Sequence, residues 1–255
     1  LETAILKRAE AICCPSKIMR SLLVERGIRE EKILVTPNGI NIEKFDINQD
    51  GREIRRLYGL EGKVIIGFVG SLRNFLGIYT ILESARQVLS QRKDFHFMVV
   101  GEGGAFSDME RYIQENSLAD RFTLTGGVPH SDIPRYIAAM DIGLAPYRYR
   151  KPFHNSPMKI SEYMAMAKPV IASAQGQIKD VIEHRENGLL IEPDDSDGLT
   201  RAILELGGDK SMMRNMGLNA RATVETSYTW EANARKVLAI YRSLSDGEIT
   251  LDYEK

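Results

Sequence analysis

The residues best suited to chemistry lie in one segment, SPMKISEYMAMAKPVIAS, at positions 156–173. A turn containing Pro157 opens a predicted helix that carries Lys159 and Glu162 and leads directly into an apolar strand. The amino end of such a helix offers free backbone amides and a favourable dipole, which together bind anions. Glu162 lies roughly one and a half turns into the helix, within reach of ribose hydroxyls. By spacing alone, Lys159 and Glu162 fit a solvated helix face equally well.

Two glycine-rich corners follow predicted strands. Gly70 and Ser71 close the strand at 63–70, and a Gly-Glu-Gly-Gly run at 101–104 follows the next strand. In an open parallel sheet, ligands bind beyond the carboxyl ends of the strands, where glycines let backbone amides approach phosphates. Neither corner has the spacing of a dinucleotide fingerprint, and tight strand-to-helix packing explains such glycines as well.

These motifs are positioned by short apolar strands that alternate with helical patterns from residue 64 onward. This alternation predicts an α/β fold, a Rossmann-like doubly wound parallel sheet covered by helices. The expected strands are 63–70, 95–101, 122–124, 142–145, 169–172 and 189–191. The expected helices are 78–90, 110–116, 131–139, 156–167, 178–184, 195–206 and 210–226.

The front of the chain differs and is predicted to be a fragment of a second α/β domain. Residues 1–45 are the expected remnant of this domain with its linker, which the Pro37-Asn38-Gly39 turn interrupts. Residues 46–228 are the expected Rossmann-like domain, and residues 229–255 a final helix that returns to the domain junction, with a polar tail. Since the chain begins at Leu1, inside a helical pattern and without methionine, we expect it to be a piece of a longer protein.

Composition narrows the class of protein. The 255 residues are 43% hydrophobic and 27% charged with a formal net charge of −1, which suits a globular protein and gives no bulk attraction for nucleic acid. The apolar runs are strand-sized, far below a membrane span, and no secretory signal opens the chain. The adjacent Cys13 and Cys14 are expected to be buried small hydrophobes on a strand. We therefore expect a cytoplasmic protein.

Other polar residues are interpreted as structural. Asp195 and Asp197 imitate an Asp-x-Asp metal motif but directly precede a helix, so they are expected to cap it. His96 lies in an apolar strand and is expected to be structural, whereas His184 is expected on the surface. His130 remains a weaker candidate for function. No set of His, Cys, Asp and Glu has zinc spacing, so no metal is expected.

In their order along the chain, these motifs resemble the retaining glycosyltransferase family 4, also called glycosyl transferases group 1, which has the GT-B fold. The resemblance covers nearly the whole chain, from about Leu1 to Arg242. The matching pieces are CPSKIMRSLL, ILVTPNGIN, IGFVGSLRNFLGI, MVVGEGG, FTLTGGVPHSDIPRYIAAMDIGLAPY, SPMKISEYMAMAKPVIAS, NGLLIEPDD and SYTW.

The resemblance implies transfer of a sugar from a UDP-sugar or GDP-sugar to a glycan or lipid-linked acceptor, with retained anomeric configuration and no cofactor or metal. Catalysis in this family is largely stabilisation of the departing diphosphate. The chain would be the carboxyl-terminal, donor-binding domain of an enzyme of polysaccharide biosynthesis. Glu162 is implied to hold the ribose. The other implied donor-binding residues are Gly70, Ser71, Val128, Pro129, Ser156, Pro157 and Met158.

Three departures from the family pattern qualify this expectation. Ser71 and Leu76 stand where the family has an arginine and a lysine on the diphosphate, so Arg73 and Lys159 are expected to supply the catalytic cations instead. His154 replaces a glutamate that touches the sugar, and it either bonds a sugar hydroxyl or makes no contact. Most of the acceptor domain is missing, so this chain alone is expected to be inactive. Peripheral attachment to the inner face of a membrane is expected only through that missing part.

Two other functions remain open at this stage. The loss of two cations at the diphosphate also fits a nucleotide-binding module without catalysis. A sugar-nucleotide epimerase of the same architecture would act without an acceptor.

Overall fold

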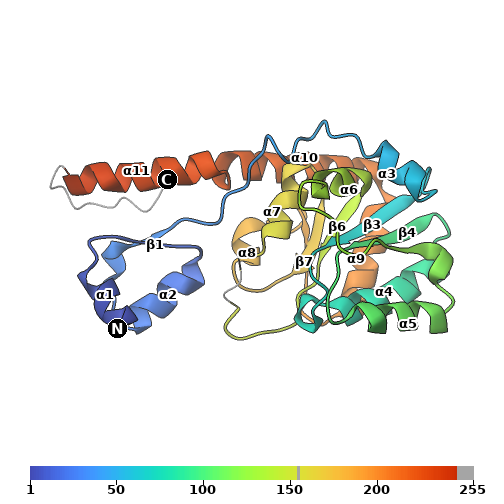
Figure 1. The fold of residues 1–255 in the computed structure, drawn as a ribbon, viewed down its shortest axis with the longest axis horizontal. Coiled ribbons are helices and arrows are strands. Elements are labelled where there is room, and N and C mark those ends of the chain that lie inside the picture. Colours follow the sequence, from blue (N-terminus) through green and yellow to red (C-terminus); the bar gives the residue numbers. More distant parts are fainter. Residues whose placement is uncertain (154–155, 246–255) are drawn as a thin grey trace.

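The computed structural model describes residues 1–153 and 156–245, which form a small lobe, a large α/β domain and a long final helix (Figure 1). The lobe contains α1 (Glu2–Arg8), β1 (Ile12–Cys14), α2 (Lys17–Glu25), η1 (Glu30–Lys32) and β2 (Ile33–Val35). Strands β1 and β2 pair in parallel, with Ile12 opposite Ile33. Both residues belong to a small apolar core of the lobe's own.

The large domain is built on a parallel sheet of six strands in the order β5-β4-β3-β6-β7-β8. The strands are β3 (Val64–Val69), β4 (Phe95–Val100), β5 (Phe122–Leu124), β6 (Ile142–Ala145), β7 (Val170–Ser173) and β8 (Leu189–Ile191). Sequence order reverses between β3 and β6, because the chain first adds strands on one side of β3 and then on the other. The predicted Rossmann-like doubly wound sheet is thus confirmed.

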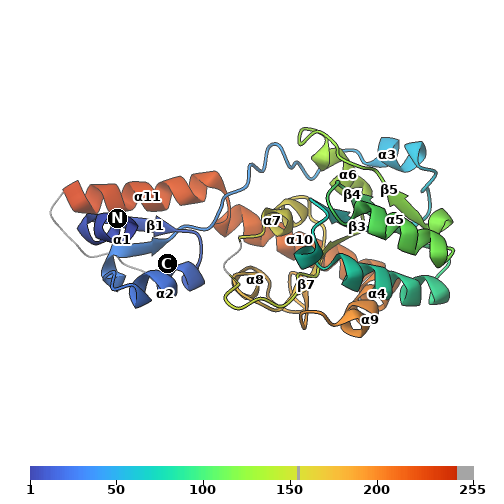
Figure 2. The same cartoon turned by 60° about the horizontal axis from the view of Figure 1, so that its bottom comes forward.

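Helices cover both faces of this sheet, which explains why its central strands are apolar along their whole length. Contacts join α4 to α5 and α9, α3 to α6, and α7 to α10. Figure 2 shows these helices around the sheet. The helices are α3 (Arg52–Leu57), α4 (Ile78–Gln91), α5 (Phe106–Glu115), α6 (Ile133–Ala139), α7 (Met158–Ala165), α8 (Ile178–Val181), α9 (Ser196–Gly208) and α10 (Lys210–Ser227). Two 3-10 turns, η2 (Asn74–Leu76) and η3 (Ala119–Arg121), complete the domain.

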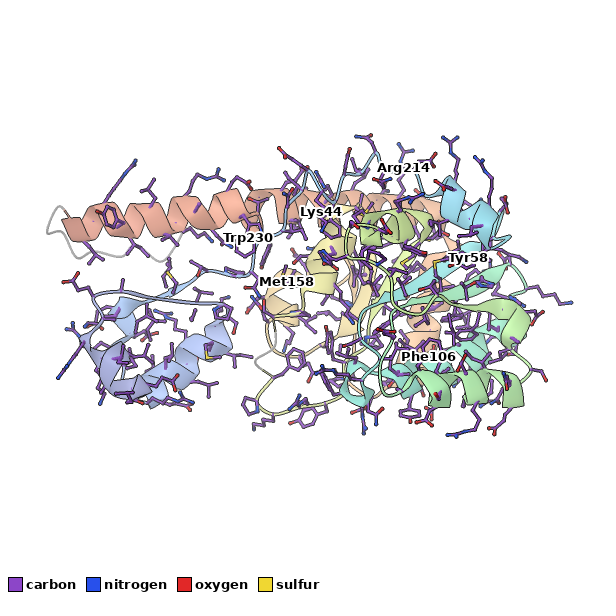
Figure 3. The ribbon with its side chains drawn as sticks, in the orientation of Figure 1. Lys44, Tyr58, Phe106, Met158, Arg214 and Trp230 are labelled. Atoms are coloured by element: carbon purple, nitrogen blue, oxygen red, sulfur yellow. The ribbon has the colours of Figure 1, made fainter. Side chains whose placement is uncertain are left out.

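The linker packs closely against the large domain and the start of the final helix. Ile40 and Phe45 of the linker belong to the hydrophobic core of the large domain. The domain boundary expected at residue 45 stays a prediction. A Cβ at Gly39 would lie 2.6 Å from the backbone nitrogen of Trp230, which marks where the linker crosses α11 (Trp230–Ser245) (Figure 3). From there α11 extends alongside the small lobe (Figure 1). No described helix, α11 included, is long and apolar enough to cross a membrane.

The expected burial of both cysteines is half correct. Cys14 is buried, whereas Cys13 is exposed. Neighbouring side chains on a strand point to opposite faces, so β1 buries only one of the two against the small core.

Candidate functional site

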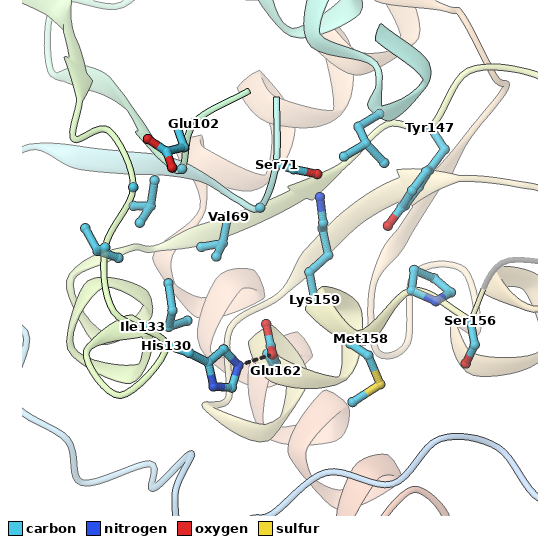
Figure 4. Close-up of a pocket in the computed structure, with 17 residues that line it drawn as sticks. Val69, Ser71, Glu102, His130, Ile133, Tyr147, Ser156, Met158, Lys159 and Glu162 are labelled. Atoms are coloured by element: carbon cyan, nitrogen blue, oxygen red, sulfur yellow. Dashed lines mark ion pairs between the residues drawn. The ribbon is translucent and has the colours of Figure 1, made fainter. Parts of the chain in front are cut away.

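A cavity of about 720 Å³ lies at the point where the strand order reverses. It is bounded by the corner after β3 at Gly70, the corner after β4 at Gly101, Tyr147 beyond β6, and the start of α7 (Figure 4). In open α/β sheets this switch point is where ligands bind, because the loops after the two central strands diverge there. The volume is in the range of small-molecule sites.

The glycine corner after β3 brings backbone close to the cavity. Gly70 has φ +134, a region that side chains rarely adopt, and a Cβ there would lie 3.0 Å from Nζ of Lys159. A Cβ at Gly101 would lie 2.1 Å from the carbonyl oxygen of Gly70. Glycine at both positions lets the two corners pack together and leaves room for the lysine.

Lys159, in the first turn of α7, directs its ammonium group at this corner. Its Nζ is buried between Ser71 and Tyr147, and it has no hydrogen-bond partner within residues 1–153 and 156–245 (Figure 4). Nζ lies 3.9 Å from the ring centroid of Phe68 and 5.5 Å from that of Tyr147. Burial lowers the pKa of Lys159 to about 7, against the opposing attraction of Glu162. A buried cation without a partner is unfavourable, so the site is suited to an anion.

Glu162 lies one turn further along α7 and is also buried, with 8% of its surface exposed. Its Oε1 is 3.5 Å from Nε2 of His130, whose Nδ1 is 2.6 Å from Nζ of Lys44. Burial raises the pKa of Glu162, and the hydrogen bond with His130 and the charges of Lys159 and Lys44 oppose this rise. Residues three apart on a helix share a face, so Glu162 and Lys159 both reach the same cavity.

Tyr163 holds α7 in place. Its hydroxyl accepts a hydrogen bond from the backbone nitrogen of Val69, the last residue of β3, at 2.7 Å. Its ring is fully buried against Gly143 of β6, where a Cβ would lie 2.5 Å from the ring. The tyrosine therefore fastens the helix that carries Lys159 and Glu162 across the switch point.

Most of the predicted donor-binding residues come together here. The cavity is lined by Gly70, Ser71, Val128, Ser156, Pro157, Met158, Lys159 and Glu162. Pro129 is not among the lining residues, although its neighbours Val128 and His130 are. His154 lies outside the described residues, so both alternatives for it, a hydrogen bond to a sugar hydroxyl or no contact, stay predictions.

Arg73 is not brought into this cavity, contrary to expectation. It lines a neighbouring cavity, together with Arg148 and Arg150. The reason is local, because the backbone nitrogen of Arg73 bonds the carbonyl oxygen of Ser71 and η2 begins at the next residue. This turn carries the Arg73 side chain past the corner that Lys159 faces.

Several residues of the site were not anticipated from the sequence. Tyr147 and Glu102 line the cavity, and Lys44 reaches it through His130. Leu76, which stands in place of the family lysine, lines the cavity as well. Tyr163, beside Glu162 in an amphipathic helix, gave no signal of its own because its hydrogen bond is to a residue far away in the chain. The glycine run at 101–104 was the only pattern that pointed toward Glu102.

The other polar candidates have structural partners. His96 is buried and its Nε2 is 2.9 Å from the hydroxyl of Thr123, as expected for a structural residue. His184 is exposed, as expected. Oδ1 of Asp195 accepts a hydrogen bond from the backbone nitrogen of Gly198 at 2.7 Å, which confirms the expected helix cap. The described part of the chain contains no group of three His, Cys, Asp or Glu residues that could hold a metal ion.

The fold and the site together define a Rossmann-like α/β domain whose switch-point cavity holds a buried lysine ammonium group and a buried glutamate. Among solved structures, HepE from Anabaena, crystallised with UDP, superposes with a TM-score of 0.85 at 21% identity, over 94% of this chain and 66% of that one. This likeness establishes the fold.

Residues 63–209, more than half of the chain, match the family described as glycosyl transferases group 1, and the chain belongs to this family. Alpha-D-kanosaminyltransferase of Streptomyces kanamyceticus is 28% identical over 192 residues, which cover 75% of this chain and 49% of that protein. The amylovoran biosynthesis glycosyltransferase AmsK of Erwinia amylovora is 28% identical over 232 residues, 90% of this chain and 55% of its own length. The chain thus spans about half the length of these relatives.

Proposed function

We propose that this chain is the donor-binding part of a glycosyltransferase that moves a sugar from a nucleoside-diphosphate sugar to a glycan or lipid-linked acceptor, with retention of configuration. The observation that carries the proposal is the pairing, in one cavity, of a buried ammonium group that has no hydrogen-bond partner among the described residues and a buried carboxylate one helical turn away. The relatives' names support sugar transfer. Crystals of HepE hold UDP, UDP with glucose, or UDP-glucose.

The proposed pose follows from the positions of the charges. The carboxylate of Glu162 accepts hydrogen bonds from the ribose hydroxyls, which are donors. The diphosphate lies on Lys159, the Gly70–Ser71 corner and the amides at the start of α7, where the helix dipole adds to the attraction. The base then extends toward Val128 and Gly127 at the far end of the cavity.

This arrangement favours cleavage of the bond between the sugar and the diphosphate. When the bond between the sugar and the diphosphate is cleaved, negative charge develops on the departing oxygen next to Lys159. A fixed cation in a water-poor site stabilises that charge more than the spread charge of the intact donor. Because the protein supplies the cation, the proposed reaction requires no metal and should survive a chelator. Use of a nucleotide sugar implies a cytoplasmic site, at the inner face of the membrane when the acceptor is lipid-linked.

Calorimetric titration with UDP, GDP and ADP tests the proposal. We expect one nucleotide to bind selectively and Glu162→Ala to weaken that binding roughly 10- to 100-fold, because two hydrogen bonds to a charged group are lost. The 2′-deoxy analogue should bind the wild type more weakly, and the Glu162→Ala variant should discriminate less. Glu115→Ala, at the exposed end of α5, is the matched control. No binding of any nucleotide, or equal binding by the variant, would contradict the proposal.

A further inference from the structure

A second cavity, of about 650 Å³, adjoins the first. The two are separated by the corner after β3 and by the segment beyond β6. The chain lines the first cavity at Ser71 and Tyr147, and the residues that follow, Leu72 and Arg148, line the second. Whatever occupies the second cavity therefore lies next to the proposed diphosphate site, on the other side of the Ser71–Leu76 loop.

Positive charge dominates this second cavity. Arg73, Arg148 and Arg150 line it, and the only carboxylate among its described lining residues is Asp108. That carboxylate is already engaged, with Arg111 at 2.6 Å and the hydroxyl of Tyr79 at 3.2 Å.

Two of the three guanidinium groups are available. Arg148 pairs with Asp194 at 3.0 Å. Within the described ranges Arg73 and Arg150 form no ion pair, and Arg150 lies 5.4 Å from the ring centroid of Phe75. The cavity thus holds more cations than its own carboxylates neutralise.

The loops that carry the arginines are tied to each other. The backbone nitrogen of Arg148 bonds the carbonyl oxygen of Phe75 at 3.1 Å, which joins the Arg73 loop to the Arg148–Arg150 loop. The second carboxylate oxygen of Asp194 accepts a hydrogen bond from the backbone nitrogen of Tyr149 at 3.0 Å, which also holds the Arg148–Arg150 loop.

The buried Gln175 fastens the same loop from below. Its amide donates to the carbonyl oxygens of Tyr147 at 3.1 Å and Arg148 at 2.9 Å, and its oxygen accepts the backbone nitrogen of Arg150 at 3.2 Å. The arginines therefore project from a held backbone, unlike solvated side chains on a loose loop.

We propose that this cavity binds the phosphate group of a phosphate-bearing acceptor. Guanidinium groups present paired donors that match phosphate oxygens, and two of them that line one cavity and form no ion pair with the described residues suit such a group. Phe75 and the exposed Tyr149 supply an apolar wall for the organic part of the acceptor. The inference rests on the proposed function, since it assigns the acceptor side of the same transfer, and it gives Arg73 a role outside the donor site.

The test uses the chain saturated with its nucleotide, so that the donor site is filled. Hexyl phosphate, inorganic phosphate and hexanol are titrated separately by calorimetry. The variant is Arg73→Gln with Arg150→Gln, and the control is Arg185→Gln, an exposed arginine paired with Glu205 at the far edge of the sheet. Both variants are expected to fold, because Arg73, Arg150 and Arg185 are all exposed. Thermal melting checks this.

We expect hexyl phosphate to bind more tightly than inorganic phosphate or hexanol, and the double variant to weaken it about tenfold while the nucleotide affinity stays unchanged. Equal binding of hexyl phosphate by wild type and double variant would overturn the inference. So would inorganic phosphate binding as well as the ester, which would assign the cavity to a free anion. A parallel loss of nucleotide affinity would return Arg73 to the donor site. Absence of nucleotide binding in the first place would overturn the proposed function, and it is measured separately.

Discussion

His130 links Glu162 to the linker residue Lys44: its Nε2 lies 3.5 Å from Oε1 of Glu162, and its Nδ1 lies 2.6 Å from Nζ of Lys44. Because a lysine ammonium group only donates, Nδ1 must accept, and Nε2 carries the proton that faces the carboxylate. The imidazole is thereby oriented as a donor toward Glu162. Through this chain, a residue of the linker influences the proposed ribose site.

Replacing His130 with alanine should weaken nucleotide binding and change its pH dependence. Burial raises the pKa of Glu162, and the hydrogen bond from His130 opposes that rise, so its loss raises the pKa further. The ionised carboxylate is the better acceptor, so affinity falls as pH drops through this pKa. We expect roughly 3- to 10-fold weaker binding near neutral pH and an acid-side loss that begins at higher pH. Nucleotide affinity measured across the pH range checks this.

Lys44→Ala should shift the same pH profile in the same direction by less, since Lys44 acts on Glu162 by its charge and through its hydrogen bond to His130. His184→Ala is the control, because that imidazole bonds the backbone nitrogen of Leu190 at 3.0 Å, away from the cavity. Superimposable profiles for wild type and His130→Ala would show that the histidine does not act on Glu162.

Replacing Lys159 with methionine should separate function from stability. Loss of the cation should lower sugar transfer by the whole protein about 100-fold and weaken UDP or GDP much more than the matching nucleoside. The melting temperature should stay level or rise, because an ammonium group that is buried without a hydrogen-bond partner in the described part of the chain is exchanged for an apolar side chain of similar length. Thermal melting and parallel titrations with nucleotide and nucleoside measure the two effects.

Lys168→Met is the control at a half-buried lysine that has a hydrogen-bond partner. Its Nζ donates to the carbonyl oxygen of Ala138 at 2.9 Å, so this substitution should destabilise by about 1–2 kcal/mol and leave nucleotide binding intact. If Lys159→Met lost as much stability as Lys168→Met, Lys159 would have a structural partner.

The stability of the empty protein should rise with pH because of Lys159. Burial lowers the pKa of Lys159 to about 7 in the folded state, whereas its ordinary value is 10.5. Between these values the unfolded chain binds more protons at this site, so the free energy of unfolding increases with pH across the window. Urea unfolding at several pH values, from about 7 to about 9.5, should show the advantage of Lys159→Met over wild type shrinking as pH rises.

Other groups that titrate in this range, such as Lys168, are common to both proteins and cancel in the difference. A difference between the two proteins that is constant with pH would mean that Lys159 keeps its ordinary pKa. Saturating nucleotide should also reduce the effect, because the diphosphate favours the charged lysine.

Local pattern was sufficient to predict the sheet and much of the cavity. The alternation of short apolar strands with helices identified each strand of the large sheet, since a strand buried on both faces must be apolar along its length. The SPMKISEYMA segment identified the helix that carries Lys159 and Glu162, because a turn followed by amphipathic spacing is a local signal. Parallel strands that alternate with helices place such helix starts at the carboxyl edge of the sheet.

Contacts between segments far apart in the chain could not be predicted from local sequence pattern. The bonds from Val69 to Tyr163 and from Lys44 to His130 join residues far apart in the chain, and no spacing in the sequence signals them. Cys13 and Cys14 are equally apolar as residue types, and the packing of β1 alone decides which of them is covered.

The sequence by itself thus determined the strands of the large sheet, most of its helices but not α3, their α/β order, the family motifs and the presence of two candidate cations. Only the tertiary structure decided between these cations. Arg73 is three residues from Gly70, yet the turn before η2 carries it into the second cavity, whereas Lys159 arrives from α7 and ends beside Gly70. Closeness along the chain does not set the direction of a side chain, because that direction depends on the backbone turn and on the packing of the element that bears it.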